Sequence, residues 1–84
     1  METVFIAFET NIWHADPTYV CVGSSIDECI KLIKKNNQDL IKNVITKQSH
    51  VIINKVTVNE YESDTRVLDT SYDDNFYLLV VNGN

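Results

Sequence analysis

Residues 20–30 read Val20-Cys21-Val22-Gly23-Ser24-Ser25-Ile26-Asp27-Glu28-Cys29-Ile30. The β-branched residues before Gly23 are typical of a strand, and Ser25 with Glu28 has the spacing of a helix capping box. The apolar residues that follow recur at the spacing of one buried helical stripe: Ile26, Cys29, Ile30 and Ile33. The segment therefore predicts a strand, a short turn and an amphipathic helix.

Upstream of this segment the sequence predicts a β-hairpin. Thr3–Glu9 and Thr18–Val22 are rich in β-branched and aromatic residues, as strands are. Residues 10–17 include asparagine, aspartate and the only proline of the chain, which favours a loop. We expect two antiparallel strands joined by this eight-residue connection.

Downstream the pattern predicts one more helix and three more strands. Asn36 and Asn37 interrupt the first helix, and Asp39 is placed to cap a second one whose buried stripe is Leu40, Ile41, Val44 and Ile45. The expected strands are His50–Asn59, Thr65–Thr70 and Phe76–Val81, separated by polar turns.

The element order β-β-α-α-β-β-β predicts an α+β fold, a two-layer sandwich in which helices pack on one face of an antiparallel sheet of about five strands. With 84 residues, the chain 1–84 is expected to form one domain. Apolar residues occur at both parities of the expected strands, as in Phe5 and Ala7 against Val4, Ile6 and Phe8. The second sheet face is therefore either an interface with a protein or a second copy, or is covered within the monomer by loops, the second helix or sheet twist.

Charge is distributed in three blocks. The chain has seven basic and twelve acidic residues, for a net charge of −5, and six lysines lie within residues 31–55 between two acidic segments. A net negative chain opposes direct binding to nucleic acid or to anionic membranes. No apolar run reaches the roughly 20 residues of a membrane span, and the start lacks the pattern of a signal peptide, so a cytoplasmic protein is expected.

The most unusual composition lies at Trp13, His14 and Asp16. A loop tryptophan suits an interface anchor, although it can equally fold back on the core as a lid. A second candidate for partner binding is acidic, since carboxylates can imitate a row of phosphates: Glu60, Glu62, Asp64, Asp73 and Asp74. In a meander these acids fall at opposite ends of the sheet, and solvated turns are the alternative interpretation.

The sequence predicts no enzyme, because no nucleophile accompanies His14 and no phosphate-binding glycine loop is present. No cofactor is expected. The two cysteines, Cys21 and Cys29, have apolar neighbours and are expected to be free and buried rather than metal ligands. The lysines of residues 31–47 are expected to be solubilising, with an anion or acidic partner as the alternative.

The stretch 20–30, with its strand, glycine and capped helix, resembles small uncharacterised proteins encoded by bacteriophages and mobile elements. Residues 56–62 are similar to a later strand of those proteins that ends in acidic and aromatic residues, so the resemblance covers about residues 3–62. It implies an α+β fold and supplies no catalytic residues. Because such accessory proteins often bind a host protein, it also implies an inhibitor of a host defence or nucleic-acid-handling protein.

Two functional hypotheses follow. The first is a non-enzymatic protein-binding module that uses the Trp13 segment, an acidic patch or an uncovered sheet face. The second is a small-ligand binder, for instance for a signalling nucleotide, that acts as a dimer.

Overall fold

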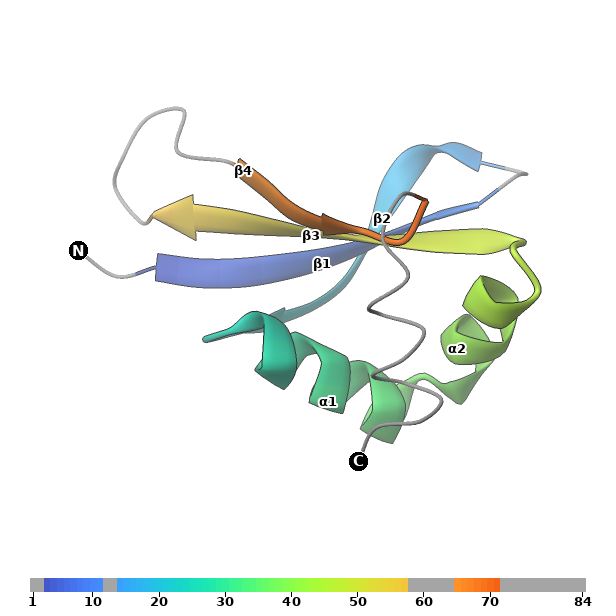
Figure 1. Ribbon diagram of the computed structural model, residues 1–84, viewed down its shortest axis with the longest axis horizontal. Coiled ribbons are helices and arrows are strands. Elements are labelled where there is room, and N and C mark those ends of the chain that lie inside the picture. Colours follow the sequence, from blue (N-terminus) through green and yellow to red (C-terminus); the bar gives the residue numbers. More distant parts are fainter. Residues whose placement is uncertain (1–2, 12–13, 58–64, 72–84) are drawn as a thin grey trace.

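A computed structural model describes residues 3–11, 14–57 and 65–71, and within them the chain forms an α+β fold (Figure 1). The elements follow one another as β1 (Thr3–Asn11), β2 (His14–Gly23), α1 (Ile26–Asn36), α2 (Gln38–Ile45), β3 (Ser49–Thr57) and β4 (Thr65–Asp69). The predicted class, an antiparallel sheet with two helices packed on it, is confirmed.

Among the described residues the sheet has four strands in the order β2-β1-β3-β4, with every neighbouring pair antiparallel. The central pair, β1 and β3, runs in continuous register from Thr3 opposite Thr57 to Asn11 opposite Ser49. The prediction of about five strands is therefore slightly off, and the predicted strand Phe76–Val81 lies outside the described residues.

The first hairpin is tighter than predicted. The loop expected over residues 10–17 is wrong, since β1 continues through Asn11 and β2 already begins at His14. Proline did not end the strand because β2 is an edge strand, where a missing backbone N–H can face away from the neighbour. Register shifts between Ala7 and Phe8 and between Glu9 and Asn11 take up the extra residues of β2.

Helix α1 begins as predicted. Ser25 is its N-cap, and Ser25 Oγ accepts a hydrogen bond from the Glu28 backbone N–H at 3.1 Å. Ser24 Oγ donates to Glu28 Oε2 at 2.5 Å, which fixes the carboxylate over the first turn. The predicted stripe is confirmed at its centre, where Cys29, Ile30 and Ile33 are buried.

Helix α2 is capped by Asn37, so the prediction of Asp39 is wrong. Asn37 has a non-helical backbone, its Oδ1 accepts from the Leu40 N–H at 3.2 Å, and its own N–H donates to the Ile33 carbonyl at 2.8 Å. One residue thus ends α1 and starts α2, which leaves Asp39 in the first turn. The predicted stripe fails at its end: Ile45, the last residue of α2, is exposed.

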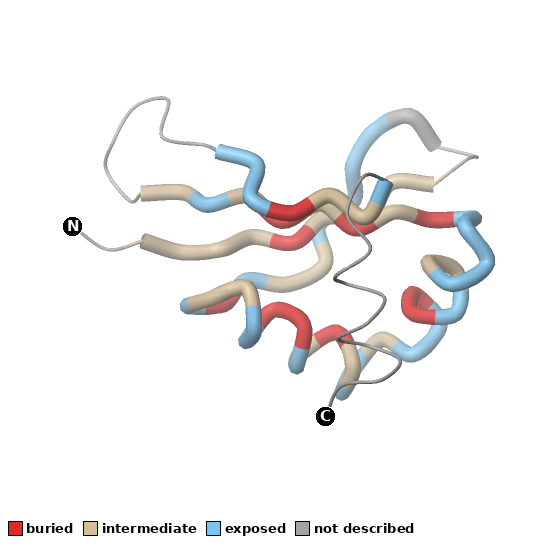
Figure 2. The backbone as a smooth tube through the Cα atoms, viewed as in Figure 1, coloured by how far each residue is buried: buried red, intermediate tan, exposed pale blue. Residues whose placement is uncertain are grey.

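The core lies between the helices and one face of the sheet (Figure 2). The strands contribute Ala7, Val51, Ile53 and Leu68, and the helices contribute Cys29, Ile30, Ile33, Leu40 and Ile41. Removal of these side chains from water is the main stabilising term of such a small fold. Ser49 is buried beside them, where its Oγ donates to Glu9 Oε2 at 2.7 Å.

Candidate binding face

The sheet has a second face, turned away from the helices. Ala7, Val51 and Ile53 point into the core, so strand alternation turns their neighbours to the other side. We call this side the outer face; the residues that define it are Val4, Ile6, Phe8, Tyr19, Val22, Ile52, Asn54, Val56 and Arg66. Neither helix of the described chain covers it (Figure 1).

The outer face is mainly apolar. On the central pair, Val4 lies opposite Val56 and Phe8 lies opposite Ile52, and all four side chains are partly exposed. On β2, Tyr19 is 60% exposed and Val22 is 44% exposed. Contiguous apolar side chains of this kind on a small protein are the usual mark of an interaction surface.

Charge is sparse on this face. The outward positions of β1 and β3 within the described ranges carry no lysine, aspartate or glutamate. Arg66 of β4 is the cation at its rim, and its Nη1 forms an ion pair with Asp69 Oδ2 at 3.1 Å. The central part of the face therefore suits an apolar partner rather than an acidic or basic one.

A pocket of about 130 Å³ lies on the outer face, and it is lined by Phe8, Pro17, Ile52, Asn54 and Arg66. These residues come from all four strands. The first half of β2 and the short β4 both lie on the side of the sheet away from the helices (Figure 1). Pro17 of β2 and Arg66 of β4 line the pocket from these two strands. The twist of the sheet thereby turns an apolar face into a concave one.

Asn54 is the polar residue at the centre of this face. It lies between Ile6 of β1 and Arg66 of β4 in the two ladders. Its Oδ1 is buried and has no hydrogen-bond partner, the one such side-chain atom found within the described residues. A buried acceptor without a donor destabilises a fold by about 1–3 kcal/mol, so this oxygen is an unused hydrogen-bonding site.

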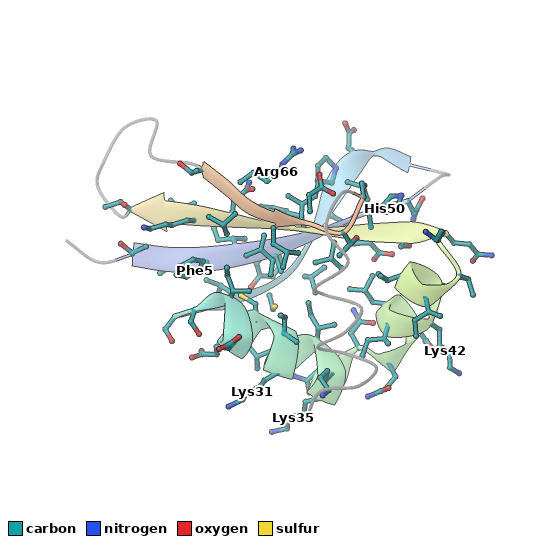
Figure 3. All side chains as sticks on the ribbon, viewed as in Figure 1. Phe5, Lys31, Lys35, Lys42, His50 and Arg66 are labelled. Carbon is teal, nitrogen blue, oxygen red and sulfur yellow. The ribbon has the colours of Figure 1, made fainter. Side chains whose placement is uncertain are left out.

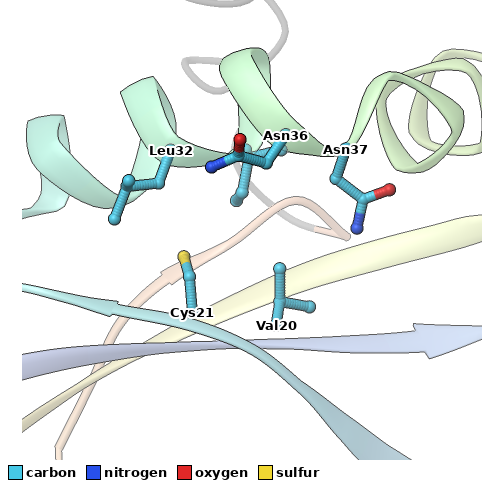
Figure 4. A pocket seen from close by; sticks show the side chains of 6 residues that line it. Val20, Cys21, Leu32, Asn36 and Asn37 are labelled. Atoms are coloured by element: carbon cyan, nitrogen blue, oxygen red, sulfur yellow. The ribbon is translucent and has the colours of Figure 1, made fainter.

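A second cavity, of about 170 Å³, lies between β2 and the helices (Figure 4). Two of its lining residues, Asn37 and Cys21, already make hydrogen bonds within the fold. Asn37 Oδ1 caps α2, and Cys21 Sγ donates to the Cys29 carbonyl at 3.7 Å. Leu32, Ile33, Val20 and Asn36 complete the wall.

Both cysteines are free, as predicted; Cys29 is buried, whereas Cys21, also expected to be buried, is only half-buried. Burial, with a smaller contribution from the neighbouring thiol of Cys21, raises the pKa of Cys29 to about 12. Burial also raises the pKa of Cys21. The thiolate is the nucleophilic form, so these two side chains are poor nucleophiles at neutral pH.

The sequence-predicted site residues are not brought together by the described structure. Trp13, Glu60, Glu62, Asp64, Asp73 and Asp74 lie outside the described residues. His14 is the first residue of β2 rather than a loop residue, and Asp16 is exposed on the same strand. Within the described ranges, no group of three or more histidine, cysteine and acidic residues is placed to hold a metal ion.

Three lysines of the helices lie on the opposite side of the molecule from the outer face. Lys31, Lys35 and Lys42 project from the helices away from the sheet (Figure 3). Lys31, Lys35, Lys42 and Lys47 are exposed, and Lys34 is partly so. The basic helical surface and the apolar outer face are therefore separate surfaces.

Sequence reasoning missed Asn54, Arg66, Pro17 and Tyr19 as site residues. A signal for Asn54 was present, because it interrupts the apolar row of Ile52 and Val56 in a strand whose other side is also apolar. Pro17 was missed because it was assigned to a loop, whereas β2 extends back to His14. Tyr19 was placed in a strand, but the side of the sheet to which it points depends on the pairing of β2 with β1. The position of Arg66 depended on the pairing of β4 with β3.

Comparison of the chain with protein families, with curated proteins and with solved structures found no match. No helix among the described residues is long and apolar enough to cross a membrane.

Proposed function

We propose that this protein is a non-enzymatic binding module that engages a protein partner through the outer face of its sheet. One observation carries the proposal: the helices pack on one face, and the other presents a concave row of apolar side chains with few charges. A surface of this composition is stabilised when a complementary apolar surface excludes water from it.

The chemistry of the face supports binding rather than turnover. Its pocket is lined by aromatic, aliphatic, amide and guanidinium groups, and the two thiols lie in or beside the core. Aromatic and arginine side chains such as Phe8, Tyr19 and Arg66 are the types enriched at the energetic centres of protein interfaces.

Free cysteines suit a reducing compartment, so we place this activity in the cytoplasm. Inhibition of a host defence or nucleic-acid-handling protein is the biological role attached to the proposal, and it rests on the phage-protein resemblance alone.

Two substitutions at matched positions test the face. Val22 on the outer face is 44% exposed and Ile45 at the end of α2 is 43% exposed, so a glutamate is tolerated by the fold at either place. Partners captured from the native host are identified, purified and titrated against Val22→Glu and Ile45→Glu. A carboxylate left unpaired in an apolar contact is strongly unfavourable, so we expect Val22→Glu to weaken binding at least tenfold.

The Ile45→Glu variant should bind like the unaltered protein. Equal affinities of the two variants, or a loss confined to Ile45→Glu, would overturn the assignment of the outer face.

A further inference from the structure

We infer that the pocket on the outer face receives Tyr19 from a second copy of this chain, and that the pocket of that copy receives Tyr19 in return. The inference rests on the outer face being the binding face, and it adds that, in the absence of another partner, the occupant is a second copy. Two observations support the inference. Asn54 Oδ1 is an acceptor without a partner, and the phenol of the exposed Tyr19 is a donor on the same face.

The unpaired oxygen of Asn54 favours a ligand that carries a hydrogen-bond donor. Asn54 lines the pocket, and the terminal torsion of an asparagine is soft, so its amide can turn to meet a donor that enters the pocket. A donor that enters from outside then replaces the bond that the oxygen lacks.

The rest of the lining calls for an aromatic ring. Phe8, Pro17 and Ile52 supply apolar contacts, and cavities of about 150 Å³ are large enough for benzene, close to the volume of about 130 Å³ here. Arg66, whose side chain is 58% exposed, can place its guanidinium against the face of a ring. A tyrosine side chain is a six-membered ring that carries a donor.

Tyr19 meets these requirements. It lies opposite Phe8 in the β1–β2 ladder, so it points to the outer face, and it is 60% exposed. A two-fold symmetric contact uses the same surface twice, so a group and its complement must both lie on that surface. Tyr19 and the pocket satisfy this condition, since Pro17 of the lining is only two residues away.

Charge also favours a second copy. Arg66 and Asp69 of the same chain neutralise each other in an ion pair. The outward positions of β1 and β3 carry no lysine or acid in the described ranges. Two such faces meet without like charges at their centre, in the manner of two packed sheets.

The test is the dimer dissociation constant from sedimentation equilibrium of the full chain at micromolar concentrations. Tyr19→Phe keeps the ring and removes the donor; two equivalent hydrogen bonds are lost, so we expect a roughly 30-fold weaker dimer. Tyr19→Ala should weaken it roughly a thousandfold, since two aromatic anchors are lost. Thr18→Ala, at the neighbouring exposed position whose side chain has the opposite orientation, should leave it unchanged.

Mixing two defective variants separates an inserted tyrosine from a general loss of structure. Asn54→Phe fills the pocket, so neither Tyr19→Ala nor Asn54→Phe forms an intact contact with itself. A mixed pair holds one intact contact, the Tyr19 of one variant in the pocket of the other, so the mixture should associate more tightly than either variant alone.

A monomeric unaltered chain, or a dimer whose stability Tyr19→Ala does not change, would overturn this inference. Either result leaves the proposed function open to its own test, because the Val22 and Ile45 variants are scored on a different protein partner. Absence of association in the mixture, with both variants folded by circular dichroism, would likewise overturn the exchange of tyrosines.

Discussion

Asn54 of β3 lies opposite Arg66 of β4, and both side chains line one pocket on the outer face. They are polar groups beside Phe8, Pro17 and Ile52, the apolar residues that line the same pocket. A buried polar group adds little affinity unless its partner is correctly placed, and it penalises every arrangement that leaves it unpaired. This relationship gives the outer face a basis for selecting its partner, beyond the non-directional attraction of its aliphatic residues.

The core should depend on Ile53 far more than on an exposed isoleucine. Ile53 is fully buried on β3, so Ile53→Ala removes apolar contacts and leaves a cavity. We expect the free energy of unfolding to fall by about 2–5 kcal/mol. Ile45→Ala, the same change at an exposed site, should alter it by less than about 0.5 kcal/mol. Urea denaturation of the two variants measures this difference, and similar losses would show that the core has been placed wrongly.

The boundary between the helices should be sensitive to Asn37 rather than to Asp39. Asn37→Ala removes the acceptor for the Leu40 N–H, and loss of such a cap lowers stability by about 1 kcal/mol. Asp39→Ala should have a smaller effect, because its carboxylate only interacts with the first-turn dipole. If Asp39→Ala proves the more destabilising of the two in thermal unfolding, the cap seen here is incorrect.

Lys47 is a position where glycine should stabilise the protein. It has a φ of 63°, and it follows the C-cap Thr46 in a pattern where the Lys47 N–H donates to the Val44 carbonyl and the Gln48 N–H to the Asn43 carbonyl. A left-handed backbone is unfavourable for lysine by about 1–2 kcal/mol and costs glycine little. We expect Lys47→Gly to raise the free energy of unfolding by about 1 kcal/mol.

The matched control is Lys42→Gly, because Lys42 lies inside α2 whereas Lys47 follows its end. There glycine should destabilise by about 1 kcal/mol, since the backbone is helical. Opposite signs for the two lysines are the expected calorimetric result, and equal signs would rule out the left-handed cap.

Alkaline pH should destabilise the fold through Cys29. Its pKa is raised from 9.0 to about 12 in the folded chain, so the unfolded chain loses the thiol proton first. Between about pH 9 and 12 the folded state therefore binds more protons than the unfolded state, and the free energy of unfolding falls as pH rises. Below pH 9 this contribution is fully present.

Cys29→Ala isolates the effect, because alanine has no proton to release. The variant should start from a lower stability at neutral pH, since it leaves a cavity, but lose stability less steeply above pH 9. Parallel pH profiles of the two proteins in urea denaturation would contradict the raised pKa.

The local part of the fold was predictable from sequence. Ser25 and Glu28 define the start of α1, and the period of two through Val51 and Ile53 identifies β3, because backbone geometry dictates both patterns. The end of the first hairpin was not predictable, because Pro17 is tolerated only on an edge strand and strand order is a tertiary property. The cap of α2 was predicted at Asp39 and lies at Asn37, because the same residue ends α1 with a non-helical backbone and starts α2.

The candidate site was predictable as a face but not as a pocket. Alternation showed that Val4, Ile6 and Phe8 need a cover of their own. The pocket requires Pro17 and Arg66 to meet over that row, which depends on the pairing of two edge strands that lie far apart in the sequence.

Site-directed photocrosslinking tests the central claim, that the outer face is the binding face. A benzophenone amino acid replaces Val22 on the outer face or Ile45 on α2, two positions of almost equal exposure, and the cells that carry the protein are irradiated. We predict crosslinks to a discrete protein, a second copy included, from position 22 and none above background from position 45. Crosslinks from position 45 alone would contradict the claim and would assign binding to the helical surface.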